Sequence, residues 1–478
     1  MSPRQIVYFI VTCLLLLGLI CIFFPQDNAW GLRWPTLANI LAENQQNNLF
    51  VTFEDSTLVI SDSTFADTLA ALSSTYNNLQ STTPTAELST PQATPSMPNL
   101  SQIATSPTTF SKKPISPASG ALELFKVGLQ EANTRQVRVV HYGDSQIEEG
   151  RITYNLRQHL QAIYGGSGIG WLPIPMTTSS KTTKMTITMN GKMVTRKSNL
   201  PRYTVYGHAA MHRTDNNNYG AVGQVTKMDT LLCEGSNHLH ISIQPLQENI
   251  ATYPFSQLRI IAQGDITVNG SEQLILYYPD STTGCQLDIE GQGDLFGISL
   301  ESSHGVILDN VPMRGSIGNV FTKMDTAQLA AYYQATNTRL IILQYGGNLL
   351  PGIKSANRIY GYVKNMRAQV RCLRQCAPQA SIVFVGPSDM LTTIDGVVTS
   401  YPYLELLDYQ LAKMASEEGI GYWSLLQAMG GIGGMQTWQD KGWAASDGVH
   451  FSHQGANRAG ELLWEWLEKE LNLENDEL

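Results

Sequence analysis

Two short segments of the sequence place a nucleophile and an amide donor directly after apolar runs. Residues 143–145 read Gly-Asp-Ser and follow the apolar run 137–142. A serine on a loop that opens a helix gains from nearby backbone N–H groups. Residues 346–348 read Gly-Gly-Asn and follow the run 340–345. An asparagine amide at that point can donate a hydrogen bond to a developing oxyanion.

A third segment offers an acid–base pair. Asp447 and His450 stand three residues apart in the stretch 446–451, just before the last predicted helix. The carboxylate can hold one imidazole nitrogen, which leaves the other nitrogen free to take a proton from a hydroxyl such as that of Ser145.

Each of these segments also has an ordinary structural explanation. Gly-Asp-Ser and Gly-Asn are common in turns, and Asp447 and His450 could simply cap a turn and pack. The combination is more specific, because all three segments fall at predicted strand ends or before a helix. In open α/β sheets, ligands bind at the carboxyl ends of the strands.

The elements around these segments alternate between strand and helix. Helical periodicity is predicted for residues 122–129, 151–163, 326–335, 359–376, 404–419 and 453–471, and buried strands for 137–142, 305–310, 340–345, 381–386 and 421–425. Such alternation favours a mostly parallel sheet with helices on both faces. We therefore predict an α/β domain formed by residues 120–171 and 305–478.

Residues 172–304 have a different pattern. Runs of alternating apolar and polar residues are predicted as strands at 184–189, 239–243, 258–262, 265–268, 274–278 and 285–289. Short strands at close spacing are typical of a β-sandwich or jelly roll. We predict an all-β domain inserted into the α/β domain.

The N-terminal quarter predicts a membrane anchor and a tether. Residues 6–24 form an apolar run without charge, preceded by Arg4, and a run of this length can span a bilayer. Residues 1–25 are predicted to be a retained anchor, with a cleaved signal or a lipoprotein signal at Cys21 as alternatives. Residues 26–119 become rich in Ser, Thr and Pro and predict a flexible tether. Because Arg4 favours a cytoplasmic N-terminus, the rest of the chain would be extracytoplasmic.

Composition excludes one class of partner. The chain has 478 residues and a formal net charge of −9, and no stretch is rich in Lys and Arg. This argues against nucleic-acid binding. Cys233 and Cys285 both fall in the β-rich region and could form a disulfide in an oxidising compartment, or remain two separate thiols.

Metal binding is not predicted. His208 with His212 and His238 with His240 have spacings that could bind a metal, but no third ligand is evident in the sequence. No pair of C-x-x-C motifs is present.

The segment 141–147 resembles the first block of the SGNH/GDSL hydrolases, residues 346–348 resemble their Gly-x-Asn block, and residues 447–450 their Asp-x-x-His block. The remaining block would supply a glycine, for which Gly315 is preferred over Gly318. The resemblance implies a flavodoxin-like three-layer fold.

The resemblance also implies roles for the residues. Ser145 would be the nucleophile, His450 the acid–base residue and Asp447 its orienting partner. The N–H groups of Ser145 and Gly315 and the amide of Asn348 would bind the oxyanion. No cofactor would be required.

The β-insertion and the membrane-proximal start look similar to bacterial cell-envelope esterases that remove O-acetyl groups from peptidoglycan or polysaccharide. The predicted substrate is therefore an acylated glycan or another ester. Two alternatives remain open: a glycan O-acyltransferase that uses the same three residues, and a non-catalytic glycan-binding protein on a hydrolase scaffold.

Overall fold

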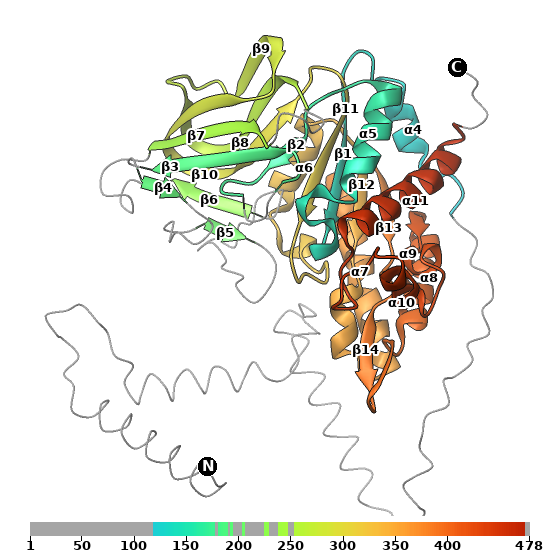
Figure 1. Ribbon diagram of the computed structural model, residues 1–478. Coiled ribbons are helices and arrows are strands. Elements are labelled where there is room, and N and C mark those ends of the chain that lie inside the picture. Colours follow the sequence, from blue (N-terminus) through green and yellow to red (C-terminus); the bar gives the residue numbers. More distant parts are fainter. Residues whose placement is uncertain are drawn as a thin grey trace, which may run out of the picture. The chain divides into compact units, whose positions relative to one another are not determined.

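The computed structural model describes residues 118–176, 180–189, 192–194, 203–205, 224–228, 238–246 and 253–473 (Figure 1). The predicted anchor 1–25 and nearly all of the predicted tether 26–119 lie outside these residues. Within the described part of the chain, no helix is both long and apolar enough to cross a membrane.

The α/β part is built on a five-stranded parallel sheet. Its strands are β1 (Gln136–Gly143), β11 (Gly305–Pro312), β12 (Thr338–Gln344), β13 (Ser381–Val385) and β16 (Gly421–Trp423). The strand order is β11-β1-β12-β13-β16, and every neighbouring pair is parallel. The strand order reverses between β1 and β12, and ligands of such sheets bind at this switch point. The predicted α/β class with a mostly parallel sheet is confirmed.

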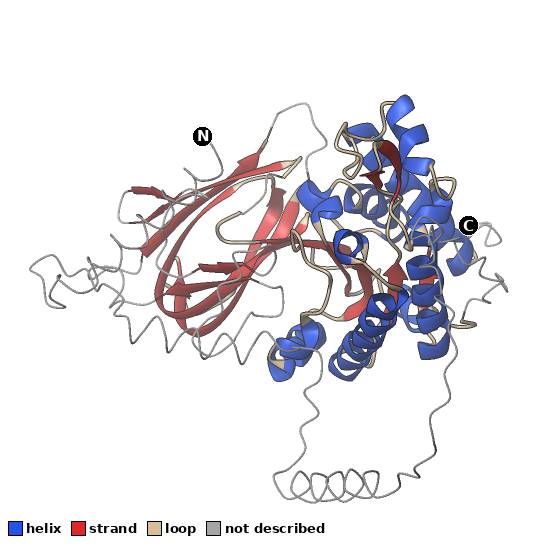
Figure 2. Ribbon diagram, turned by 90° about the horizontal axis from the view of Figure 1, so that it is seen from below, coloured by secondary structure: helices blue, strands red, loops and turns tan. Residues whose placement is uncertain are grey.

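Helices cover both faces of this sheet (Figure 2). One hydrophobic core contains α4 (Glu123–Leu129), α5 (Thr153–Tyr164) and α11 (His453–Leu471), and the other contains α6 (Thr326–Ala335), α7 (Ala356–Cys376) and α8 (Leu404–Glu418). Val139 belongs to the first core and its neighbour Val140 to the second. Successive strand residues point to opposite faces, so a strand buried on both sides has the continuous apolar character seen in the sequence.

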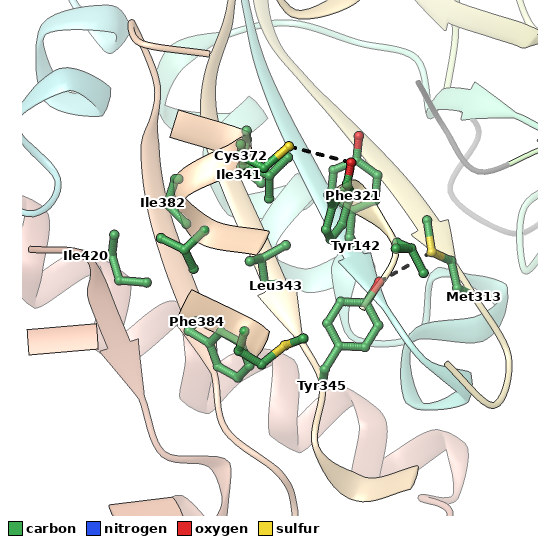
Figure 3. Close-up of a cluster of buried hydrophobic side chains, with 14 of the residues drawn as sticks. Tyr142, Met313, Phe321, Ile341, Leu343, Tyr345, Cys372, Ile382, Phe384 and Ile420 are labelled. Atoms are coloured by element: carbon green, nitrogen blue, oxygen red, sulfur yellow. Dashed lines mark hydrogen bonds between the residues drawn. The ribbon is translucent and has the colours of Figure 1, made fainter. Parts of the chain in front are cut away.

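Part of the second core is shown in Figure 3. Ile341, Leu343, Ile382 and Phe384 project from β12 and β13 at alternate positions and are nearly fully buried. On α7, Cys372 packs on this cluster, and its thiol donates a hydrogen bond to a backbone carbonyl 3.5 Å away. The core therefore fixes the strands whose ends carry the candidate site.

The strands between residues 170 and 301 form an antiparallel sheet. They are β2 (Gly170–Leu172), β3 (Thr183–Met189), β4 (Lys192–Val194), β5 (Tyr203–Val205), β6 (Gln224–Met228), β7 (His238–Pro245), β8 (Phe255–Val268), β9 (Ile275–Thr282) and β10 (Cys285–Glu301). β10 pairs along one edge with β8 and along the other with β7, β6 and β2 in turn. The described strands among these residues therefore form one connected sheet. The inserted β-sandwich or jelly-roll domain stays a prediction.

Two strands that the sequence predicts separately form one continuous strand in the structure. The sequence predicts a break between 258–262 and 265–268, but β8 runs through Gly264. A Cβ at Gly264 would lie 2.6 Å from the carbonyl oxygen of Gln292 on the paired strand. Here glycine allows two backbones to approach closely, and it does not mark a turn.

Several short elements were not predicted. These are β14 (Leu391–Ile394), β15 (Val397–Ser400), α9 (Leu425–Ala428), α10 (Gly434–Asp440), η2 (Ser145–Gly150), η3 (Phe321–Lys323) and η4 (Gly347–Gly352). Asp395 and Gly396, between β14 and β15, both have positive φ. Asp-Gly is a strong signal for a two-residue hairpin turn, so the sequence did carry the information for this hairpin.

A buried arginine ties the two sheets together. Arg138 on β1 is fully buried, and its Nη1 donates to Asp309 Oδ1 on β11 at 2.7 Å and to Ser299 Oγ on β10 at 3.2 Å. Its Nη2 donates to Glu301, also on β10. Burial alone would lower the pKa of Arg138, but the two carboxylates raise it. The guanidinium is therefore charged and holds β10 against the parallel sheet.

Replacement of Arg138 by methionine is expected to lower the free energy of unfolding by about 3–5 kcal/mol, because Asp309 would remain buried without this cation. Glu301 would keep only Arg259, whose Nε lies 3.3 Å away. Urea denaturation measures this. Arg135→Met is the control, since Arg135 is 54% exposed in its pairing with Glu131, and the change there should stay within about 1 kcal/mol. Similar losses in the two variants would contradict this account of the interface.

Candidate active site

The side chains predicted as nucleophile, acid–base residue and orienting partner lie in contact. Ser145 Oγ is 2.9 Å from His450 Nε2, although 305 positions separate the two residues in the sequence. His450 Nδ1 is 2.8 Å from Asp447 Oδ2. The other oxygen of Asp447 accepts from the backbone N–H groups of Val449 and His450, each at 2.9 Å. The structure thus brings Ser145, His450 and Asp447 into one hydrogen-bonded relay.

The partners determine where the imidazole proton lies. An ionised carboxylate only accepts, so His450 Nδ1 donates to Asp447 and Nε2 is left to accept from the hydroxyl of Ser145. Partial burial would raise the pKa of Asp447, but the hydrogen bonds from the ring and backbone of His450 and from the backbone of Val449 outweigh burial and hold it below its ordinary value. Asp447 is therefore ionised at neutral pH, as an orienting partner must be.

Contacts between distant loops hold this relay in place. Gln146 Nε2 donates to the carbonyl of Val449 at 2.6 Å. Arg151 Nη2 donates to the carbonyl of Ser145 at 2.9 Å and its Nη1 to that of Phe451 at 3.2 Å. Both side chains link the loop after β1 to the loop before α11. The sequence does not predict that Gln146 and Arg151 link these loops, because nothing in it shows which distant carbonyl each side chain reaches.

The amide of Asn348 lies beside the nucleophile loop but is already engaged. Its Nδ2 donates to Asp144 Oδ2 at 3.0 Å and to the carbonyl of Ser316 at 3.2 Å. Gly315, which precedes Ser316, has φ of 72° in the loop after β11. The structure therefore brings the loop of Gly315 and the side chain of Asn348 together. To donate to an oxyanion, Asn348 would have to release one bond, and the longer one to Ser316 is the weaker.

Asp144 has a role that the sequence analysis missed. It is buried, and its Oδ1 accepts from the N–H of Gln146 at 3.0 Å, while Oδ2 holds Asn348. Burial raises its pKa from 3.8 to about 6, although the hydrogen bonds and His450 act in the opposite direction. Asp144 thus joins the loop of the nucleophile to the predicted oxyanion donor.

The raised pKa of Asp144 predicts a pH-dependent stability difference. Since the folded pKa of about 6 lies above the unfolded value of 3.8, the folded state binds the proton more tightly, and this stabilisation is lost as the pH rises from about 4 to 6. The stability of wild type relative to Asp144→Asn should fall by about 2.4 kcal/mol from pH 4 to pH 7. Urea denaturation across this range measures the difference, and a pH-independent difference would contradict the assignment.

A hollow of about 370 Å³, partly open to solvent, lies beside Ser145. The residues that line it include Gly347, Ser388, Met390 and Leu425. A Cβ at Gly347 would approach the sulfur of Met390 to 3.1 Å. The hollow is therefore narrow beside the loop of Asn348.

The remaining predicted candidates lie elsewhere. His238 Nε2 and His240 Nδ1 both bond to Asp288 Oδ1, at 2.8 and 2.9 Å, and no group of three or more metal-binding side chains is found among the described residues. His208, His212 and Cys233 lie outside the described residues, and Cys285 carries a free thiol.

Comparison with known proteins adds to this geometry. No protein-family model matches the chain. No curated protein matches it either. A solved structure of a peptidoglycan O-acetylesterase aligns with 74% of this chain and 97% of its own, with a TM-score of 0.57 and 22% sequence identity. The chain has the fold of that esterase.

Two further structures match shorter parts of the chain. A carbohydrate acetylesterase from Sinorhizobium meliloti has 13% identity and a TM-score of 0.26, covering 34% of this chain and 79% of its own. A GDSL-like lipase from Parabacteroides merdae has 16% identity and a TM-score of 0.26, covering 34% and 72%. In the parallel sheet of this chain, Ser145 follows β1 and Asn348 follows β12, the two strands at the switch point.

Proposed function

We propose that the chain is a serine ester hydrolase that removes acetyl or other short acyl groups from cell-envelope glycans, with Ser145, His450 and Asp447 as its catalytic residues. The observation that carries the proposal is the 2.9 Å contact between Ser145 Oγ and an imidazole whose other nitrogen is held by a carboxylate. Nucleophilic catalysis by serine requires such an adjacent, oriented base.

The reaction follows from this arrangement. Ser145 Oγ forms a bond to the ester carbonyl carbon while its proton passes to His450 Nε2. When the bond to the leaving alcohol breaks, His450 gives the alcohol its proton and an acyl-serine remains. Water then repeats the two steps, which releases the carboxylic acid and restores Ser145. Asp447 stabilises the imidazolium in each half.

The oxyanion would be held at the meeting point of three loops. The proposed donors are the N–H groups of Ser145 and Gly315 and the amide of Asn348, after it releases the carbonyl of Ser316. A single donor of this kind is typically worth about 2.7–4 kcal/mol of the activation barrier. The bond from Asn348 to Asp144 would keep the amide in place during this exchange.

The glycan substrate is supported by the similarity to a peptidoglycan O-acetylesterase and by the narrow hollow beside Ser145, which suits a short acyl group. Placement at the cell envelope rests on the apolar residues 6–24, which follow Arg4.

The proposal is tested by incubating the full-length protein in detergent with O-acetylated peptidoglycan and measuring free acetate. We expect acetate release in proportion to the enzyme, with the same polymer after mild base de-acetylation as the blank. Acetyl groups that move to an added sugar alcohol without free acetate would instead identify a transferase. Binding of the polymer without turnover of any ester would identify a glycan-binding protein.

A further inference from the structure

A second, larger hollow is lined in part by the end of the η2 segment. It has a volume of about 530 Å³, partly open to solvent. Its lining comes from η2, α5, the segment after β2 and the end of β11, and includes Glu149, Tyr154, Arg157, Trp171, Lys181 and Asn310. α5 packs against β11, and β11 against β2 (Figure 1). Because its lining residues belong to these elements, the hollow lies where the two sheets meet.

Arg157 in this hollow is a buried cation without a counter-ion. Its side chain lies on α5 and the residue is only 5% exposed. Its Nη2 donates to the carbonyl of Leu308 at 2.8 Å, whereas its Nε has no acceptor among the described residues. Burial lowers the pKa of Arg157. Arginine is almost never buried without a partner, because the loss of hydration costs several kcal/mol.

The nearest carboxylate does not serve as that counter-ion. Asp309 interacts electrostatically with Arg157, but its oxygens already have other partners. Oδ1 accepts from Arg138 Nη1 at 2.7 Å and from the N–H of Trp171 at 2.9 Å, and Oδ2 accepts from Tyr332 at 2.6 Å. The guanidinium also lies over the ring of Tyr253, 5.7 Å from its centre. The group left for something that enters the hollow is therefore Nε, which has no acceptor among the described residues.

A second cation lies on the same hollow. Lys181 Nζ sits 5.8 Å from the ring centre of Tyr154, and among the described residues it forms no ion pair. Glu149 is the one carboxylate among the described lining residues. Two cations and one carboxylate leave a net single positive charge, which matches a monoanion such as a carboxylate better than a phosphate dianion.

The hollow also adjoins the proposed reaction site. Glu149 and Gly150, which line it, end the η2 segment that begins with Ser145. Arg151, the next residue, holds the carbonyl of Ser145. One short segment of the chain therefore carries both the nucleophile and part of the wall of the hollow.

We propose that this hollow is a substrate subsite in which Arg157 and Lys181 bind a carboxylate carried by the acylated glycan, beside the sugar whose ester is cleaved. The inference rests on the proposed esterase function and narrows its substrate to carboxylated glycans. Tyr154 and Trp171 would contact the sugar ring, since aromatic side chains pack on apolar sugar faces while the cations hold the acid group.

The test compares two sugars that differ only in the charge of one group: 6-O-acetyl-N-acetylmuramic acid and its lactyl amide, with p-nitrophenyl acetate as a substrate that lacks any sugar. For the full-length wild type, kcat/KM should be at least about tenfold higher for the acid than for the amide, since a hydrogen-bonded charge pair is worth this or more. Equal values for acid and amide, with p-nitrophenyl acetate still hydrolysed, would overturn the subsite.

Variants of Arg157 and Lys181 test whether these two residues cause the preference for the acid. Lys181→Gln and Arg157→Gln should lower kcat/KM for the acid about tenfold or more, and leave the amide and p-nitrophenyl acetate within about twofold. Lys184→Gln, an exposed lysine on β3, is the matched control and should change nothing. If Arg157→Gln does not fold, Lys181→Gln alone decides, because Lys181 is only partly buried. If the wild-type protein does not hydrolyse even p-nitrophenyl acetate, the result would instead contradict the proposed esterase function.

Discussion

Replacement of Ser145 by alanine is expected to lower kcat for acetyl esters by roughly 10⁶-fold, to the level that binding and oxyanion donors alone support. The variant keeps the hollow and the bond between His450 and Asp447, but no atom remains to form the acyl intermediate. Since Ser145 Oγ contacts only one side chain of the relay, the loss should leave the fold intact. Initial rates with p-nitrophenyl acetate and the free energy of unfolding measure the two effects separately.

Ser388→Ala is the matched control for this variant. Ser388 lines the same hollow and is more buried than Ser145, but no hydrogen bond joins it to His450. Its removal should change kcat by less than about tenfold. If the two serine variants lost activity equally, the hollow would matter for binding, and the assignment of Ser145 as nucleophile would fail.

Asp447→Asn is expected to lower kcat by about 10⁴-fold. Asp447 accepts three hydrogen bonds, two from backbone N–H groups and one from His450 Nδ1. If the asparagine oxygen keeps the backbone bonds, its NH₂ group faces Nδ1 and forces the imidazole proton onto Nε2. In that tautomer His450 cannot accept the proton of Ser145.

This tautomer change can be observed directly. ¹⁵N NMR of the imidazole should show the proton on Nδ1 in wild type and on Nε2 in Asp447→Asn. Asp440→Asn, at an exposed position on α10, should change neither the tautomer nor kcat. Wild-type activity in Asp447→Asn would show that Asp447 does not orient the base.

The helices whose bounds the sequence predicted most accurately have capping residues at their ends. α6 and α11 have the predicted bounds, because Asp325 and Ser452 accept hydrogen bonds from first-turn N–H groups as N-caps. α8 ends one residue before the predicted end because Gly419 takes the left-handed conformation. Such caps are local, so a single sequence contains them.

The connection between the two sheets could not be predicted in this way. It depends on Arg138, Glu301 and Asp309, and in the sequence each reads as one more residue of a strand. The sequence also could not predict that β10 pairs with four other strands, because register across a sheet depends on contacts between distant segments.

In the candidate site, too, some contacts could be predicted from the sequence and others could not. The residue types and spacing at Ser145, Asp447 and His450 were enough to predict which side chains should meet. They were not enough to predict that Asp144 holds Asn348 or that Gln146 reaches Val449, because both contacts form only after distant loops meet. Arg157 reads in the sequence as an ordinary polar position of a helix, and only its burial shows otherwise.

The proposed reaction depends above all on the hydroxyl of Ser145, which the imidazole of His450 makes nucleophilic. An alkyl fluorophosphonate tests this directly, because attack by an activated oxygen forms an O–P bond, releases fluoride and leaves a stable adduct. Mass spectrometry of the full-length protein should find a single adduct on the peptide that contains Ser145, and almost none in His450→Ala. Labelling at another residue, or labelling of Ser145 at the same rate without His450, would contradict it.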